Sequence, residues 1–203
     1  HSSNDEGFNA GGTATGFSPS TVIEKFPFAI TSGTSTPIGN LTINSTFSSS
    51  HSSSTNAFTA GGDPGAPTIR IEKFPFSISG GVASDTGGDL NYAAASMADY
   101  SDINGSSAFT SSGSAPTETP TWLTKIQKFP FSISSGTATN VGDINTLVKS
   151  AAGIQSHTNG FSTGGYNPPS LFSPVNIIEK FPFAISSGTA TDVGDLSAAA
   201  SRK

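Results

Sequence analysis

Three histidines are the side chains of this sequence that could bind a transition metal. His1, His51 and His157 each precede a Phe within a serine-rich stretch, and three imidazoles can hold zinc. They lie in separate repeats of the chain, however, and no His-Glu-x-x-His motif occurs. Scattered Ser and Asp carry no weight in a chain so rich in Ser. We therefore expect no metal, no cofactor and no catalytic residue.

One acidic or amide side chain recurs after a Gly near the end of each repeat, at Asn40, Asp89, Asp143 and Asp195. With Asp85, Asn140 and Asp192 nearby, these oxygens could surround a central opening and bind a hard cation. Asp and Asn more often cap their own turn, and no Asp-x-Asp-x-Asp-Gly spacing occurs. We interpret these four positions as turn residues.

Four lysines also recur, at Lys25, Lys73, Lys128 and Lys180. They could bind an anionic sugar or a neighbouring subunit. A Glu precedes three of them, and exposed charges of this kind are usually just solvated. Carboxylates are few, and no pair can be assigned to glycosidase chemistry.

Composition narrows the class of protein. The 203 residues include no Cys, so disulfides, thiolate zinc sites and a Cys nucleophile are excluded. The net charge of -5 argues against nucleic acid as a partner. No apolar run approaches the ~18 residues of a membrane span, so we expect no membrane insertion. Because the chain opens at His1 without a Met, we expect it to be a processed or excerpted piece.

The elements that position these residues repeat four times. The string Ile-[Glu/Gln]-Lys-Phe-Pro-Phe begins at Ile23, Ile71, Ile126 and Ile178. Its two aromatic positions are Phe26 and Phe28, Phe74 and Phe76, Phe129 and Phe131, and Phe181 and Phe183, with spacings of 48, 55 and 52 residues between copies. A further Phe precedes a small or glycine turn in each copy, at Phe8, Phe58, Phe109 and Phe161. We expect these twelve aromatic residues to form the core of the repeats.

Alternation in the segment 22–30 predicts a β-strand, because Phe26, Phe28 and Ile30 share one face. The Pro of Phe-Pro-Phe cannot donate to a ladder, so it belongs at a strand end, an edge or a bulge. The Phe-to-glycine segment predicts a second strand. The stretches 41–44 and 89–93 predict a third strand, and the segment 188–195 predicts a fourth. No stretch has clean helical periodicity. The predicted fold class is all-β.

Four short strands in about 50 residues, with Gly-Gly after the second, resemble a degenerate kelch repeat. The glycine pairs are Gly11-Gly12, Gly61-Gly62 and Gly164-Gly165, with Ser112-Gly113 in the third copy. The Phe-Pro-Phe formula also resembles kelch-like repeats of marine phage and environmental virus-like proteins. The resemblance implies a β-propeller with four blades of about four antiparallel strands.

The whole chain, 1–203, is then one domain. Its repeats cover about 1–40, 41–88, 89–143 and 144–196, and 197–203 completes the first blade. Through the joined termini, Phe181 and Phe26 are 48 residues apart, within the observed spacing. We therefore expect one blade to be closed by both termini. A larger ring of two chains, a four-repeat piece of a longer polypeptide, and an open β-solenoid remain alternatives.

Four aromatic residues lie off the repeat template, at Trp122, Tyr92, Tyr100 and Tyr166, and we interpret them as candidate binding residues. Low charge and Ser/Thr/Gly loops suit an exposed part. We expect a non-enzymatic structural or recognition module at the extracellular or virion surface, for example a phage appendage or fibre domain. Its partners would be other structural subunits, a surface glycan or receptor, or further copies of itself. The alternatives are a carbohydrate-binding propeller lectin and, less favoured, a kelch-like enzyme.

Overall fold

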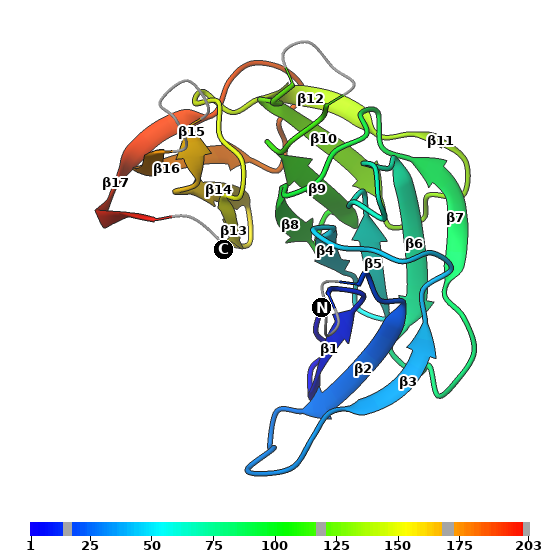
Figure 1. Ribbon diagram of the computed structural model, residues 1–203. Coiled ribbons are helices and arrows are strands. Elements are labelled where there is room, and N and C mark those ends of the chain that lie inside the picture. Colours follow the sequence, from blue (N-terminus) through cyan, green and yellow to red (C-terminus); the bar gives the residue numbers. More distant parts are fainter. Residues whose placement is uncertain (14–17, 117–120, 168–172, 201–203) are drawn as a thin grey trace.

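The strands form four sheets, one for each predicted repeat. The computed structural model describes residues 1–13, 18–116, 121–167 and 173–200, and over these ranges the chain is all-β, with strands, turns and loops and no helix. Accordingly, the described residues contain no helix that is long and apolar enough to cross a membrane. The four sheets, which we call blades 1 to 4, stand side by side in an arc (Figure 1).

Each blade is built almost entirely from antiparallel neighbours in the sequence. Blade 1 contains β1 (Glu6–Ala10), β2 (Val22–Pro27) and β3 (Thr36–Asn40). Blade 2 contains β4 (Ser49–Ser52), β5 (Asn56–Ala60), β6 (Arg70–Pro75) and β7 (Ser84–Asp89), and the short β11 (Gly136–Thr137) adds to it in parallel. Blade 3 contains β8 (Ala98–Asp102), β9 (Ser107–Ser111), β10 (Lys125–Pro130) and β12 (Thr139–Asp143). Blade 4 contains β13 (Ala152–Gln155), β14 (Asn159–Thr163), β15 (Tyr166–Asn167), β16 (Ser173–Pro182) and β17 (Thr191–Ala200). The stretches 41–44 and 90–93, which we expected to be a third strand, are loops that follow β3 and β7.

The proline of each Phe-Pro-Phe string is the last residue of its strand. Pro27, Pro75, Pro130 and Pro182 end β2, β6, β10 and β16. Proline has no main-chain N–H, and at the end of a strand this missing donor does not interrupt the hydrogen bonds between strands. The prediction that these prolines lie at strand ends is confirmed.

Aromatic side chains join one blade to the next. We call the face that a blade turns toward the following blade its trailing face, and the opposite one its leading face. The trailing face presents the Phe of the second strand, and the leading face presents both Phe of Phe-Pro-Phe. Ring centroids lie 5.0 Å apart between Phe8 and Phe76, 5.2 Å between Phe58 and Phe131, and 5.1 Å between Phe109 and Phe183. The same contact therefore recurs at all three junctions.

Three core clusters result, one at each junction between blades. Phe74, Phe129 and Phe181 are fully buried there. Fully burying one such side chain contributes roughly 1.5–3 kcal/mol, so the junctions are a main source of stability in a chain without disulfides.

The ends of the arc differ from the prediction. β17 pairs with β16 of its own blade, and blades 1 and 4 share no strand within the described residues. In Figure 1 the arc is open between β17 and the sheet of β1, β2 and β3. The expectation that both termini complete one blade is therefore not met over residues 1–13 and 173–200, and residues 201–203 lie outside the described part.

Five of the twelve predicted core aromatics are not buried. Phe76 and Phe131 are half-buried, although they pack against the core clusters of their junctions. The other three share a different reason. Phe28 is 54% exposed, and Phe26 and Phe161 are half-buried. Phe26 and Phe28 lie on the leading face of blade 1, and Phe161 lies on the trailing face of blade 4. No blade packs against either face in the described structure.

Candidate binding site on the concave face

The first strand of blades 2 to 4 lines the concave side of the arc, where β4, β8 and β13 lie (Figure 1). His51, Tyr100 and Ile154 occupy equivalent positions on these strands, since they pair with Phe58, Phe109 and Phe161. In blade 1, His1 takes this position through main-chain hydrogen bonds with Phe8 in both directions. One residue per blade thus forms a row, which we call the inner row.

Imidazoles connect the inner row from blade to blade. His1 Nδ1 lies 3.1 Å from the carbonyl oxygen of His51, and His51 Nδ1 lies 3.0 Å from that of Tyr100. Burial lowers the pKa of His51 to about 4, against the opposing effect of the hydrogen bond to Tyr100. A neutral imidazole that donates from Nδ1 satisfies this geometry. His51 is thus a structural residue.

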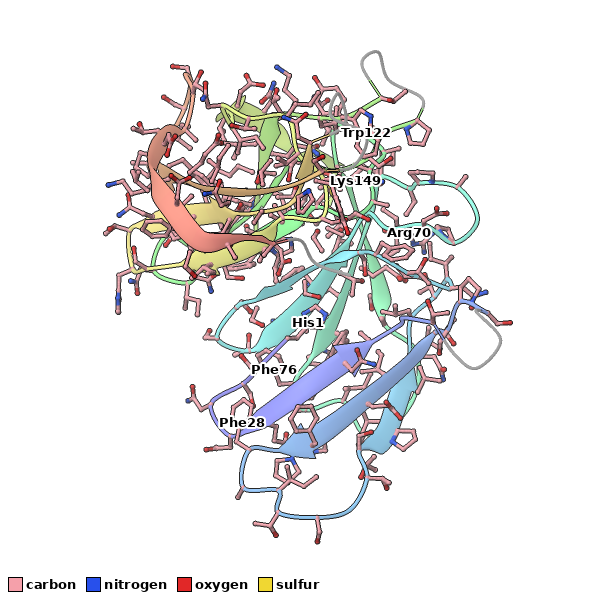
Figure 2. All side chains as sticks on the ribbon, turned by 60° about the vertical axis from the view of Figure 1, so that its left-hand side comes forward. His1, Phe28, Arg70, Phe76, Trp122 and Lys149 are labelled. Atoms are coloured by element: carbon pink, nitrogen blue, oxygen red, sulfur yellow. The ribbon has the colours of Figure 1, made fainter. Side chains whose placement is uncertain are left out.

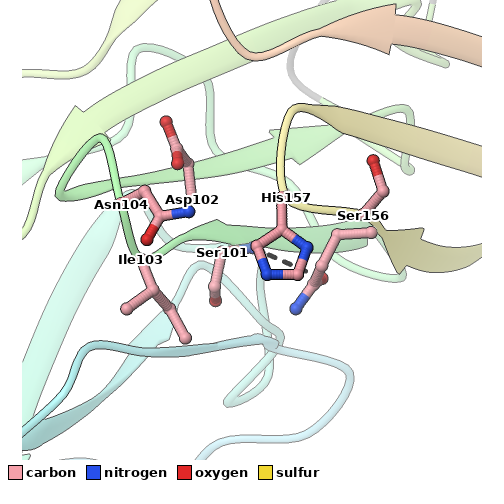
Figure 3. Close-up of a pocket in the computed structure, with 7 residues that line it drawn as sticks. Ser101, Asp102, Ile103, Asn104, Ser156 and His157 are labelled. Carbon is pink, nitrogen blue, oxygen red and sulfur yellow. Dashed lines mark hydrogen bonds between the residues drawn. The ribbon is translucent and has the colours of Figure 1, made fainter.

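A cavity of about 310 Å³ opens beside the inner row, between the β8–β9 and β13–β14 hairpins (Figure 3). Its lining combines hydroxyl, amide, carboxylate and imidazole groups with one exposed aliphatic side chain: Ser101, Asp102, Ile103, Asn104, Gln155, Ser156 and His157. Gln155 Oε1 accepts a hydrogen bond from the main-chain N–H of Ser101 at 3.4 Å, which joins the two hairpins. Asp102 is held by its own turn, because its Oδ1 accepts from the N–H of Gly105 at 2.8 Å.

A second, more polar cavity of about 550 Å³ continues along the concave face and shares Ser101, Ile103 and Gln155 with the first. Most of its other lining residues are serines of blades 1 and 2, namely Ser2, Ser3, Ser50, Ser52, Ser53 and Ser54. The two cavities form one polar trough. Hydroxyl and amide groups can both donate and accept hydrogen bonds, so the trough suits a hydrogen-bonding ligand.

The three histidines do not come together in the trough. His1 and His51 belong to the inner row, and His157 lies on the β13–β14 turn. Within residues 1–13, 18–116, 121–167 and 173–200, no group of three His, Cys, Asp or Glu side chains could hold a metal ion.

The four predicted binding aromatics do not line the trough. Tyr100 is 1% exposed, and its ring packs edge-on against Phe181 at 4.9 Å, so it is a core residue and its interpretation as a surface binder is wrong. Tyr92 is partly buried against the core between blades 2 and 3. Trp122 lies under the Lys149 ammonium, 4.3 Å from Nζ to the ring centroid (Figure 2). Tyr166 exchanges two main-chain hydrogen bonds with Lys149, so Trp122 and Tyr166 share this neighbour.

The predicted turn residues bridge blades instead of only capping turns. The carbonyl oxygens of Asn40, Asp89 and Asp143 accept 2.7 Å hydrogen bonds from Ala83, Ala138 and Ala190 of the next blade. Local capping falls to other predicted oxygens, because Asp85, Asn140 and Asp192 accept from the glycine N–H two residues on. Asp195, the fourth member, lies in β17, where it pairs with Ile177 of its own blade.

Side chains of two turn residues bond to the preceding strand. Asn40 Oδ1 accepts from Thr21 at 3.0 Å, and Asp143 Oδ1 accepts from Thr124 at 2.6 Å. Burial alone would raise the pKa of Asp143, but the hydrogen bonds from Thr124 and Lys125 and the charge of Lys125 outweigh it and hold that pKa below its usual value.

One further motif lies near the site. Gly160-Phe161-Ser162-Thr163-Gly164 matches the Gly-x-Ser-x-Gly pattern of a hydrolase nucleophile. That motif requires a sharp turn between strand and helix, with the serine exposed at its tip. Here the segment lies in and just beyond the regular strand β14, and Ser162 is buried. The match therefore does not form a nucleophile elbow.

Comparison with known proteins supports the fold. No protein-family model and no curated protein matches the chain. Among solved structures, YjhT matches with a TM-score of 0.73 and 11% sequence identity over 96% of this chain. The chain spans 64% of the length of that structure. At this identity the likeness extends to the fold and no further: an all-β chain with the sheet arrangement described above.

Proposed function

We propose that this chain is a non-enzymatic structural and recognition module, built from kelch-like propeller blades and displayed on the surface of a particle or cell. An appendage or fibre domain of a phage virion is the form we favour. Low charge and serine-, threonine- and glycine-rich loops suit such an exposed position. The observation that carries the recognition role is the polar trough on the concave face.

The trough supports recognition because its groups converge from the ends of β8 and β13 and from the turns that follow these strands. Ser101 ends up beside Gln155 through a hydrogen bond between two blades, although the residues are far apart in sequence. A volume of about 310 Å³ is at the lower end of the ~300–1,000 Å³ range of ligand cavities. The exposed Ile103 adds an apolar contact beside hydroxyl and amide partners.

Imaging the native source particle tests the location. An antibody raised against the 203-residue chain should label the particle or cell surface in electron micrographs, in a regular position. Labelling confined to the interior of cells, with surfaces bare, would contradict an external module.

Carbohydrate binding is the second candidate, and the composition of the trough favours it. Sugars present hydroxyl groups that donate and accept, together with C–H faces that pack on apolar side chains. Serine hydroxyls, the Gln155 amide and Ile103 offer both kinds of contact within one cavity.

A glycan array probed with the labelled chain tests this candidate. We expect a subset of glycans to bind, and Gln155→Ala to weaken that binding by roughly tenfold, the value of one lost hydrogen bond of about 1.4 kcal/mol. Asn9→Ala is the matched control, since Asn9 is an exposed amide of blade 1 outside both cavities of the trough. An array without binders, or equal losses for both variants, would remove the carbohydrate candidate and leave the structural role to the imaging experiment.

A further inference from the structure

The two free ends of the arc carry the two halves of the contact that joins its blades. The leading face of blade 1 presents Phe26, Phe28 and Ile30. The trailing face of blade 4 presents Phe161, Val193 and Leu196. Each of these residues has counterparts inside the arc that pack against a neighbouring blade, where they are buried or, for Phe76 and Phe131, half-buried.

Burial of the counterparts shows what each face lacks. On leading faces, Ile78, Ile133 and Ile185 are buried, whereas the equivalent Ile30 is exposed. On trailing faces, Leu41, Leu90 and Ile144 are buried, whereas the equivalent Leu196 is half-buried. Val193 is 46% exposed, whereas its counterpart Val141 is 5% exposed. The exposed residues thus occupy apolar positions that are buried in every blade with a neighbouring blade on that face.

The inner row supplies a second half-contact. His1 packs edge-on against Phe74 at 5.5 Å, His51 against Phe129 at 5.2 Å, and Tyr100 against Phe181 at 4.9 Å. Each inner-row residue therefore contacts the first Phe of Phe-Pro-Phe in the next blade. The fourth member, Ile154, is exposed. Phe26, the first Phe of Phe-Pro-Phe in blade 1, has no inner-row partner among the described residues.

Polar contacts across the junctions follow the same rule. Glu72, Gln127 and Glu179 are buried, and their side-chain oxygens accept main-chain N–H groups of Thr42, Asn91 and Asn145 in the preceding blade, at 2.8, 2.7 and 2.8 Å. The equivalent Glu24 is half-buried and accepts no such bond within the described residues. The main-chain carbonyl of Asp195 likewise receives no donor from another described blade, unlike those of Asn40, Asp89 and Asp143.

We propose that a second copy of this chain docks head to tail on these surfaces, with the leading face of blade 1 against the trailing face of blade 4. A second copy fits these surfaces because they continue the pattern of the three internal junctions. The aromatic, aliphatic and polar groups of one side of a junction lie on blade 1, and those of the other side lie on blade 4. Such an interface joins different patches on the two partners. Exposed apolar patches of this kind mark interaction sites.

Sedimentation velocity on the full 203-residue chain over a range of concentrations tests the proposal. We expect the mass to rise with concentration, either to a closed dimer or to an open series of copies; both are head-to-tail products. A chain that remains monomeric at every concentration overturns the proposal.

Two single substitutions test which surfaces meet. Phe28→Asp places a charge on the leading face and Val193→Asp places one on the trailing face; because both side chains are about half exposed, the fold should survive. Each variant alone should be monomeric. Mixed together, they retain one intact pair of faces, so they should form a dimer of one copy of each and grow no further.

Ile69→Asp is the matched control, since Ile69 is 39% exposed and lies in blade 2, away from both free faces. It should associate as the unmodified chain does. Circular dichroism should show unchanged β-structure in all three variants. Association that survives both face substitutions, association lost equally in the control, or a mixture without the mixed dimer would each overturn head-to-tail docking.

Discussion

The Phe58 ring of blade 2 stacks on the Phe131 ring of blade 3, with centroids 5.2 Å apart and planes inclined by 29°. Nearly the same geometry joins Phe109 to Phe183, at 5.1 Å and 22°. The Phe-Pro-Phe string is therefore an element of the blade junction. Its second Phe packs on the preceding blade, while its first Phe also meets the inner row.

Truncating a junction aromatic should destabilise the chain far more than truncating its counterpart at the open end. We expect Phe109→Ala to cost about 3–5 kcal/mol in the free energy of unfolding, because the side chain is fully buried. Phe161→Ala should cost much less, since that ring is half-buried and faces no blade. Urea denaturation of dilute, monomeric protein compares the two. Equal losses would mean that blade 4 is covered in the monomer.

The strands and their core aromatics could be predicted from the sequence because both signals are local. Alternation around Phe26 defines a strand, and a Phe two residues before a glycine turn defines another. The closure of the arc could not be predicted in the same way. Spacing shows how many residues separate Phe181 from Phe26 through the termini, but it does not show whether those residues pair across the gap.

The equivalence of Tyr100 to His51 was hidden by loop length. His51 precedes its Phe by seven residues, whereas Tyr100 precedes Phe109 by nine, because the β8–β9 hairpin is longer. The sequence alone therefore places Tyr100 off the template. The trough could not be predicted because it joins Ser101 to Gln155 across two blades. Its local signal was the serine-rich stretches before β1 and β5.

Removing a side chain that caps a loop of the preceding blade should be costly. Gln127 is buried, and its Oε1 accepts from the N–H groups of Asn91 at 2.7 Å and Tyr92 at 3.1 Å. Gln127→Leu removes the buried acceptor of two main-chain hydrogen bonds, each worth roughly 0.5–1.5 kcal/mol, so we expect a loss of about 1–3 kcal/mol by urea denaturation. Glu24→Leu, at the equivalent position of blade 1, should change stability by less than about 0.5 kcal/mol. Similar losses at both positions would contradict the capping role.

Mild acidification should destabilise the chain because His51 binds a proton more readily in the unfolded state than in the folded state. The imidazole has an ordinary pKa near 6.5 when unfolded and about 4 when folded. Between these values the unfolded state binds the extra proton, so stability is full above pH ~6.5 and falls by about 1.4 kcal/mol per pH unit as the pH drops. His51→Gln, which keeps a donor but does not titrate, should show a shallower decline between pH ~6.5 and ~5 in thermal unfolding. An unchanged slope would place the titrating group elsewhere.

Gly61 is the first glycine of its turn in blade 2, and Gly12 is the second glycine of the equivalent turn in blade 1. We expect Gly61 to tolerate substitution less well than Gly12. Gly61 and Gly12 both adopt a positive φ, at 65° and 97°. An added Cβ at Gly61 would lie 2.5 Å from the carbonyl oxygen of Ala94, whereas at Gly12 it would meet nothing within 4 Å. Both substitutions by Ala strain the backbone by about 1–2 kcal/mol. Gly61→Ala must also displace the main chain at Ala94, in the segment that connects β7 to β8. We therefore expect a clearly lower midpoint of thermal unfolding for Gly61→Ala than for Gly12→Ala, and equal midpoints would show that the close approach to Ala94 does not constrain the fold.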